Sequence, residues 1–249
     1  YGNAEILGVR PWDYNVMAAT EQRLQLNVVA SCIDTAVAKL GTNRPAPQFL
    51  TNGADWETRR KADKLNKFGK GMLHQVKAYA AGTMAMRDAC IFGTAFLKVY
   101  EDDKKLGADR VLPWNILVED ADGFNGKPRT LTQRMFIDRA VAKEMWPDAA
   151  DAIDRNNDPR RGATTDAGQP GDQVVVYESW HLASGPKASD GRHIIAVDGA
   201  CLLDEPWKRD HFPFAVLRWE EPIAGYWGRG IAEKLTGIQY EINLLLQRI

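Results

Sequence analysis

The sequence predicts an α+β fold, in which helices and antiparallel β-strands occupy separate stretches of the chain. Three observations support this fold class. Apolar residues in the first third recur every three or four positions, which is the spacing of amphipathic helices. From Thr94 the apolar period changes to two, which is the spacing of strands. After residue 173 the strand patterns continue until a glycine-rich segment at Gly225 introduces a last helix.

The composition is that of an ordinary globular protein. With 249 residues, the chain is long enough to bury the core of one large domain or of two small ones. Hydrophobic residues make up 45% of the chain and charged residues 26%, which is typical of soluble domains. The net charge of -1 provides no overall attraction to nucleic acid or to an anionic membrane. We therefore do not expect a basic clamp on DNA.

The cysteines and the most apolar window set further limits. Cys32, Cys90 and Cys201 are far apart and odd in number, which favours free thiols in a reducing compartment over a disulfide framework. The window 78–99 is the most membrane-like, but Arg87-Asp88 lies in its middle. Because charges are costly at the centre of a bilayer, we expect a buried helix that leads into a strand.

The N-terminal part is predicted to be helical. A helix over 16–40 should end at Gly41, because glycine is the preferred residue just after a helix. Two prolines make the segment 43–50 extended. Asp55 is the expected N-cap of a second helix. The inward-facing residues of that second helix should be Leu65, Phe68, Met72, Val76 and Tyr79.

The first strands should follow a third helix. Gly82 is predicted to act as a joint before this helix, which we expect over 83–92. Alternating apolar residues predict a strand over 94–100. Short partner strands are expected at 111–112 and 116–119.

A second strand and two short helices should come next. We expect the strand over 129–137, followed by a helix from the cap Asp138 to Trp146. Pro147 suits the first turn of another helix. Residues 155–172 have no apolar period and are rich in Gly, Pro, Asp and Asn, which predicts a mobile loop or linker.

The remaining strands lie between this loop and the last helix. One is expected over 174–182, and two more over 194–197 and 200–203. Between the latter two lies Asp198-Gly199, a strong two-residue hairpin signal. A last strand is expected over 214–219.

The last 25 residues combine a glycine elbow with an amphipathic helix. Flexible glycines should aim this helix, and they are Gly225, Gly228 and Gly230. Because no stop signal follows its apolar stripe, we expect the helix to continue in a longer protein and to pack against another subunit. The candidate subunit-contact residues of the stripe are Ile231, Leu235, Ile238, Ile242, Leu245 and Ile249.

The polar residues show no clear catalytic pattern. His74, His181, His193 and His211 lack the spacing of a metal motif, and we expect no metal and no cofactor. No phosphate-binding loop of the Walker A type and no Gly-x-Ser-x-Gly motif occurs. Carboxylates at predicted strand ends could hold Mg²⁺, but turn formation is the favoured interpretation. These carboxylates are Asp102, Asp103, Glu119, Asp120, Asp122, Glu220 and Glu221.

A basic strip is predicted on the second helix, opposite its apolar face. Its candidate contact residues recur every three positions, and they are Lys61, Lys64, Lys67 and Lys70. The strip can be a solvated surface, a site for an acidic protein surface or a contact with a nucleic-acid backbone.

Five segments in order resemble the portal proteins of tailed bacteriophages. Each motif is weak alone, and the shared order makes the resemblance more specific. The motifs are the helix and proline extension of Asn27–Leu40 and Asn43–Pro47, the helix-to-strand passage Ala89–Val99, the strand Arg110–Asp120, the strand Phe212–Trp219 and the helix from Gly228 to Asn243.

The resemblance implies a wing of helices packed on small antiparallel sheets that ends in the start of a long stem helix. The expected segments are a wing-like α+β region (1–154), a mobile loop or linker (155–172), a β-rich region of wing or clip (173–224), and the glycine elbow with the truncated stem helix (225–249).

The same resemblance implies a non-enzymatic function in the virion. Portal proteins assemble in the host cytoplasm into a homo-oligomeric ring, usually a dodecamer, at one capsid vertex. Double-stranded DNA passes through the channel of the ring. Terminase, capsid, scaffold and tail adaptor proteins are the implied partners, and no membrane is involved. The alternatives are another head-tail adaptor ring, or a metal-dependent nuclease or phosphotransferase that uses Asp120, Asp122, Glu220 or Glu221.

Overall fold

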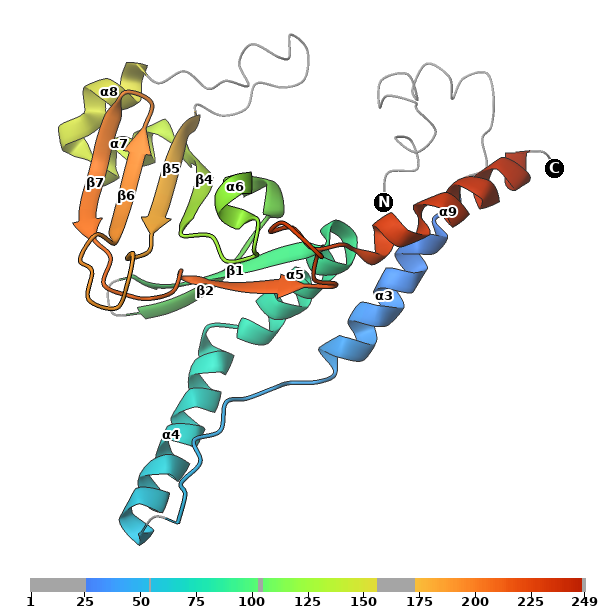
Figure 1. Cartoon of the computed structure of the whole chain (residues 1–249), viewed down its shortest axis with the longest axis horizontal. Coiled ribbons are helices and arrows are strands. Elements are labelled where there is room, and N and C mark those ends of the chain that lie inside the picture. The colour runs from blue at the N-terminus through green and yellow to red at the C-terminus, as the bar shows by residue number, and fades with distance from the viewer. Residues whose placement is uncertain (1–25, 54, 103–104, 156–172, 248–249) are drawn as a thin grey trace. The chain divides into compact units, whose positions relative to one another are not determined.

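The computed structural model describes residues 26–53, 55–102, 105–155 and 173–247 (Figure 1). The described elements confirm the α+β fold class, with helices and two antiparallel sheets. In chain order they are α3 (Val28–Gly41), α4 (Trp56–Gln75), α5 (Ala78–Phe92), β1 (Thr94–Asp102), β2 (Lys105–Val111), η1 (Pro113–Asn115), β3 (Ile116–Leu117), α6 (Asp120–Gly123), β4 (Thr130–Asp138), α7 (Arg139–Met145), η2 (Pro147–Ala149), α8 (Ala150–Arg155), β5 (Gln173–His181), β6 (Arg192–Val197), β7 (Ala200–Pro206), β8 (Phe214–Arg218) and α9 (Ile231–Gln247).

The chain forms two compact units, and its path crosses between them more than once. Unit 1 comprises Tyr1–Pro113, Phe214–Pro222 and Trp227–Ile249, and unit 2 comprises Trp114–Pro213 and Ile223–Tyr226. This division differs from the segments expected from the sequence. The strand β8 belongs to unit 1, although it lies within the expected region 173–224, and the end of the expected region 1–154 belongs to unit 2.

Unit 1 is built around a three-stranded antiparallel sheet in the order β2-β1-β8. The central strand β1 pairs along its length with β2, and its first half pairs with β8. Helix α5 packs on this sheet through small side chains, since Ala85, Ala89 and Ala95 are fully or almost fully buried there. Small residues allow a helix and a sheet to approach closely.

Helices α3 and α9 complete the core of unit 1. The buried side chains of α3 are Val29, Ile33 and Val37, which recur at helical spacing, and they cluster with Cys90 of α5. Ile231, Ala232 and Leu235 of α9 pack against the same cluster. Three helices therefore share one small apolar core.

Unit 2 contains a five-stranded antiparallel sheet in the order β3-β4-β5-β6-β7. The short helices α7 and α8 pack on it through Ala142 and Ile153, which meet Val174, Val176 and Val197 of the strands. The expected cap Asp138 is confirmed, because its Oδ1 accepts hydrogen bonds from the backbone N–H groups of Ala140 and Val141.

The predicted hairpin is also confirmed. Strands β6 and β7 are antiparallel and are joined at Asp198-Gly199. Gly199 has a φ of 82°, a left-handed conformation that glycine adopts without a steric penalty. The prediction of a mobile loop at 155–172 falls outside the described residues, except for Arg155 at the end of α8.

Three predictions about the helices need correction. The described part of the first helix begins at Val28, because Asn27 caps it by accepting a hydrogen bond from the Ala30 N–H; residues 16–25 lie outside the described chain. Gly82 lies inside α5 and is not a joint. The break between α4 and α5 is at Lys77, whose φ of 52° is left-handed.

The third correction concerns the apolar face of α4. The cap Asp55 is confirmed, since its carboxylate accepts a hydrogen bond from the Thr58 N–H. Among the predicted inward residues, however, Leu65 is 46% exposed and Phe68 is 65% exposed. The extended segment 43–50 runs along this helix and is hydrogen-bonded to it through Asn66 (Figure 1), but it leaves these two side chains exposed.

None of the described helices is both long enough and apolar enough to cross a membrane.

Candidate functional site

The predicted stripe of α9 is divided between a covered face and an exposed edge. Ile231 and Leu235 contact the shared helical core, and Ile242 is half-buried. Ile238 is 60% exposed and Leu245 is 56% exposed, so these two candidates lie outside the intramolecular contact. Ile249 lies outside the described residues. The buried face of α9 is rotated relative to the predicted apolar stripe, because two of the most buried positions of α9 are polar.

These polar positions are Gln239 and Asn243, which are 2% and 0% exposed. Gln239 Oε1 accepts hydrogen bonds from the backbone N–H groups of Val28 at 2.9 Å and Val29 at 3.2 Å. The first N–H groups of a helix have no partner within the helix, so Gln239 caps α3 from a distant part of the chain.

The amide nitrogen of Gln239 completes this connection. Nε2 donates to the carbonyl oxygen of Leu26 at 2.6 Å and to Oδ1 of Asn243 at 3.1 Å. A buried polar group is stabilising only when its hydrogen bonds are satisfied. Gln239 satisfies donors and acceptors at the start of α3 and fixes the register between α3 and α9. Apolar periodicity contains no signal for this role.

The glycine elbow has a different geometry at each of its glycines. Gly225 has a φ of 91°, and its surroundings are open. A Cβ on Gly228 would lie 2.6 Å from the carbonyl oxygen of Glu220 and 2.7 Å from that of Gly93. A Cβ on Gly230 would lie 2.7 Å from the carbonyl oxygens of Cys90 and Ile91. Gly228 and Gly230 therefore allow backbone segments to pack closely. The prediction that they act as a hinge is wrong, because a hinge needs open space around it.

This close packing joins the start of α9 to the turn between α5 and β1. The backbone N–H of Gly228 donates to Thr94 Oγ1 at 2.7 Å. The turn residue Gly93 has a φ of 85°, and a Cβ there would lie 2.0 Å from the carbonyl oxygen of Gly228. Glycines on both sides allow the two backbones to touch.

The salt bridge between Asp88 and Arg110 fixes α5 on β2. Asp88 is 1% exposed, and both of its carboxylate oxygens accept hydrogen bonds at 2.5 Å from the guanidinium group of Arg110. The hydrogen bond to Asp88 raises the pKa of Arg110 above its ordinary value. Asp88, one of the two charged residues in the middle of the apolar window 78–99, therefore forms a salt bridge in the fold.

The extended segment 43–50 and α4 form an arm of unit 1. The Asn66 side chain accepts a hydrogen bond from the Phe49 N–H at 2.7 Å and donates one to the Phe49 carbonyl oxygen at 3.4 Å. Near the base of the arm, the Tyr79 hydroxyl donates to the Pro45 carbonyl oxygen at 3.1 Å. These contacts hold the segment along the helix.

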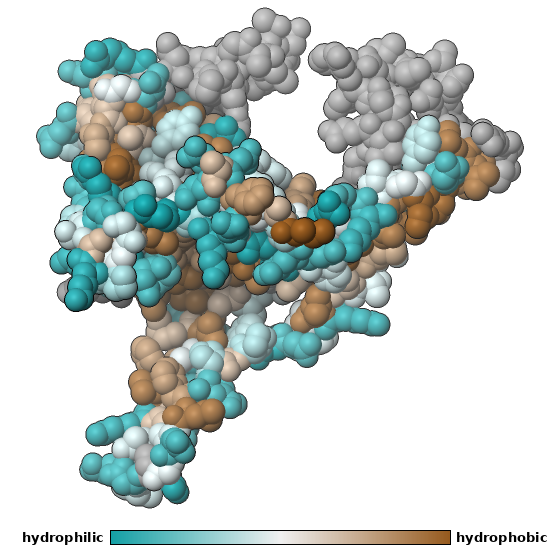
Figure 2. All heavy atoms as spheres, viewed as in Figure 1, coloured by the Kyte–Doolittle hydropathy of each residue, from teal (hydrophilic) through white to brown (hydrophobic). Residues whose placement is uncertain are grey.

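The surface of the arm carries hydrophilic and apolar side chains next to one another (Figure 2). All four lysines of the predicted strip, Lys61, Lys64, Lys67 and Lys70, are exposed. Large apolar side chains are exposed beside them. These side chains are Phe49 (48%), Leu50 (87%), Trp56 (70%), Leu65 (46%) and Phe68 (65%).

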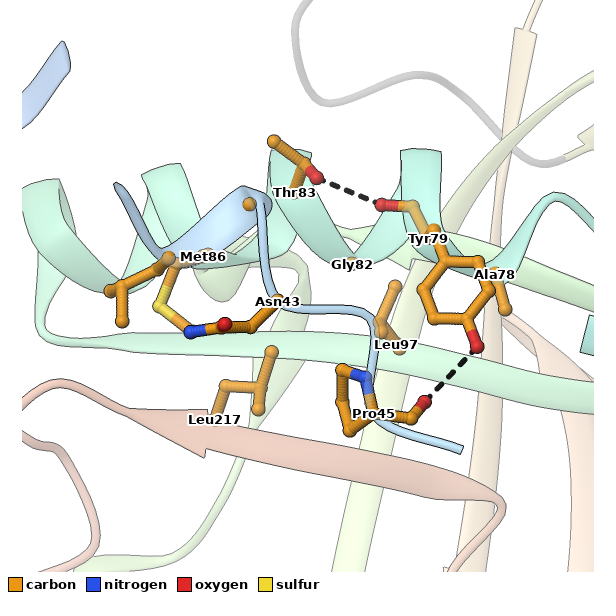
Figure 3. A pocket seen from close by; sticks show the side chains of 11 residues that line it. Asn43, Pro45, Ala78, Tyr79, Gly82, Thr83, Met86, Leu97 and Leu217 are labelled. Atoms are coloured by element: carbon orange, nitrogen blue, oxygen red, sulfur yellow. Dashed lines mark hydrogen bonds between the residues drawn. The ribbon is translucent and has the colours of Figure 1, made fainter. Parts of the chain in front are cut away.

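An apolar pocket with a volume of about 350 Å³ lies at the base of the arm (Figure 3). Figure 3 shows Leu97 and Leu217 of the sheet on one side and Met86 of α5 on the other. The remaining lining residues come from the end of α3, the extended segment and α5. They are Leu40, Gly41, Asn43, Pro45, Ala78, Tyr79, Gly82 and Thr83.

In unit 2, His193 forms a buried polar cluster that the sequence did not predict. Its Nε2 lies 3.0 Å from Glu178 Oε1, and its Nδ1 lies 2.8 Å from Glu205 Oε1. The ring stacks on Trp180 with 5.3 Å between centroids and an interplanar angle of 12°. The hydrogen bond to Glu178 raises the pKa of His193 above 6.5, with a further contribution from Glu205, although desolvation opposes the shift.

Two of the candidate metal-binding carboxylates have structural contacts, and Asp103 lies outside the described residues. Asp122 Oδ2 accepts hydrogen bonds from the backbone N–H groups of Arg129 at 2.7 Å and Thr130 at 2.9 Å. Glu220 forms a salt bridge with Lys234. Within the described ranges, no group of three or more His, Cys, Asp or Glu residues is arranged to hold a metal ion. Cys32, Cys90 and Cys201 are free cysteines.

A comparison of the sequence with known protein families finds no family model that matches. A search of curated proteins also finds no significant match.

Proposed function

We propose that this chain is part of the subunit of a portal ring of a tailed bacteriophage. In this proposal the ring occupies one vertex of the capsid in the virion, and double-stranded DNA passes through its channel. Terminase, capsid, scaffold and tail adaptor proteins would dock on it. The subunit itself performs no chemical reaction.

One observation carries the proposal: four of the five portal-like segments meet in unit 1. The segment Phe212–Trp219 contains β8, which pairs with β1 of the segment Ala89–Val99. The helix from Gly228 to Asn243 touches that same segment through Gly228 and caps the segment Asn27–Leu40 through Gln239. These four portal-like segments thus belong to one structural unit, as the proposal requires.

The exposed edge of α9 supports self-association. Ile238 and Leu245 are seven residues apart, so they lie two turns apart on one side of the helix. The intramolecular core does not cover them. A ring requires such surfaces, because each subunit contacts its two neighbours through two different surfaces.

The proposal is tested by placing charges on this edge in the full-length protein. Ile238→Asp with Leu245→Asp should abolish rings while leaving the circular dichroism spectrum unchanged, because neither side chain belongs to the core. Charges on a buried oligomer contact are strongly unfavourable. The matched control is Thr236→Asp on the exposed surface of α9, which adds a charge without removing a large apolar side chain or a salt bridge. Sedimentation velocity measures the assembly, and rings that persist in the double variant would contradict this use of α9.

The enzyme alternative predicts a different result. If Asp120, Asp122, Glu220 and Glu221 support metal-dependent cleavage, alanine at all four positions should remove a Mg²⁺-dependent nuclease signal. We expect no such signal in the purified full-length protein. If the wild-type protein shows Mg²⁺-dependent cleavage and alanine at these four positions removes it, the enzyme alternative is correct and the portal proposal is wrong.

A further inference from the structure

The arm has two apolar surfaces, one at each end, and they cannot meet within one chain. Leu50 and Trp56, which we call the arm tip, lie where the extended segment turns into α4, and they are 87% and 70% exposed. The pocket lies at the opposite end of α4, since it is lined by Ala78 and Tyr79 at the start of α5. At about 1.5 Å per residue, the 20 residues of α4 separate the two ends by roughly 30 Å.

The pocket fits apolar side chains of the size found at the arm tip. Its volume of about 350 Å³ and its wall of Leu40, Met86, Leu97 and Leu217 suit a large apolar group. Aromatic side chains inserted into preformed pockets are the commonest energetic centres of protein contacts. Trp56 is therefore the expected anchor residue, with Leu50 beside it.

Part of the charge at the arm tip is also complementary to the rim of the pocket. The exposed acidic residues Asp55 and Glu57 flank Trp56, while the guanidinium group of Arg60 lies over the Trp56 ring at 5.3 Å from its centroid. Exposed basic residues are adjacent in sequence to residues that line the pocket, namely Lys39 next to Leu40, Arg44 next to Pro45 and Lys77 next to Ala78. Opposite charges around an apolar contact favour its correct orientation over competing arrangements.

The geometry points to a second copy of this chain as the occupant of the pocket: the arm tip of one subunit inserts into the pocket of the next. A contact between two different surfaces of identical chains continues from subunit to subunit and closes into a ring when the rotation permits. This inference rests on the proposed portal function and identifies one of the subunit contacts of the ring.

Filling the pocket provides the most selective test. Gly82 lines the pocket from within α5, and a Cβ there would meet no atom within 4 Å. Gly82→Leu should therefore occupy the pocket without disturbing the fold, and it should favour the helix. Gly71→Leu is the matched control, because Gly71 is also helical and open but does not line the pocket.

The expected result concerns assembly of the full-length protein, measured by mass photometry over a concentration series. Gly82→Leu and Trp56→Ala should each raise the concentration for half-assembly at least tenfold, whereas Gly71→Leu should leave it unchanged. Thermal unfolding checks that the variants remain folded. Assembly of Gly82→Leu at the wild-type concentration would overturn the contact. If that variant assembled normally but failed to enter capsids, the occupant would be a capsid protein.

Cysteine crosslinking tests this contact separately from the portal proposal. The exposed Cys32 and Cys201 are first changed to serine. Chains with Glu57→Cys, mixed with chains carrying Arg44→Cys, should form a disulfide-linked pair that neither variant forms alone. Rings without this crosslink would refute the arm contact and leave the portal proposal intact. Failure of the wild-type full-length protein to self-associate would refute both.

Discussion

Helices α4 and α9 are both amphipathic, and they differ in what covers their apolar side chains. In α9, Leu235 packs into the core shared with α3, and the glycines before the helix press against neighbouring backbone. In α4, Ala62 is the one described residue classed as buried, and Leu65 and Phe68 remain in solvent. The same periodicity thus marks an internal core in one helix and an uncovered surface in the other. The comparison predicts that matched substitutions cost more stability in and beside α9 than in α4.

The largest difference is expected between two glycines. Gly230→Ala should lower the free energy of unfolding by about 3 kcal/mol, because its Cβ would collide with two carbonyl oxygens that cannot move easily. Gly71→Ala should raise it by about 0.5–1 kcal/mol, since alanine favours the helix and the site is open. Denaturation in urea measures both. Equal effects at the two positions would remove the distinction between the helices.

A smaller difference is expected between two leucines. Leu235→Ala should cost about 2 kcal/mol, because it removes methyl groups from the core between α3 and α9. Leu65→Ala should cost about 0.5 kcal/mol or less, since this side chain is 46% exposed. The midpoints of urea unfolding provide the comparison. A larger loss at Leu65 than at Leu235 would show that the arm has an internal core.

The polar contact of α9 should have an intermediate effect. Gln239→Ala should cost about 1–2 kcal/mol, because the N–H groups of Val28 and Val29 lose their cap. Gln75→Ala at the exposed end of α4 serves as the control, and we expect little change there. Hydrogen exchange should accelerate at the start of α3 in the first variant alone. Unchanged exchange at Val28 and Val29 would contradict the capping role.

Near neutral pH, the pH dependence of stability should come from His193 in unit 2. The raised pKa of His193 stabilises the folded protein when the ring is protonated, so this contribution is present below pH 6.5 and is lost as pH rises through the higher folded pKa. His193→Gln should therefore reduce the fall in stability as the pH rises above 6.5. Urea unfolding at several pH values measures the slope. The same slope in wild type and variant would exclude His193 as its source.

The smallest effect on the fold is expected for the basic strip of α4. Changing Lys61, Lys64, Lys67 and Lys70 to glutamine should leave stability nearly unchanged, because all four are exposed. If the strip contacts protein, the salt dependence of DNA association by assembled rings should also remain unchanged. A decrease of about one unit in the salt slope per lysine would show that the strip faces DNA phosphates.

Local signals in the sequence predicted much of the fold. Asp55 and Asp138 were identified as caps, Asp198-Gly199 as a hairpin, and Thr94 as the start of a strand, and the structure confirms each. These features depend on a few adjacent residues. Propensity and turn geometry therefore decide them before the chain folds.

Contacts between distant segments were not predictable from those signals. Gln239 interrupts the apolar stripe of α9, and only the position of α3 explains why a polar side chain is buried there. The glycine pattern predicts flexible joints at Gly228 and Gly230, because the sequence cannot reveal the carbonyl oxygens beside them. The break at Lys77 was missed because a left-handed lysine carries no local sequence signal.

The central claim is that the uncovered surfaces of α4 and α9 serve assembly into a ring. Electron microscopy of the negatively stained full-length protein tests it most directly. We predict closed particles of one rotational symmetry with a central channel, which become smaller or dissociate when Ile238 and Leu245 are changed to aspartate. Single subunits at micromolar concentration, in the presence of the phage scaffold protein, would contradict the claim.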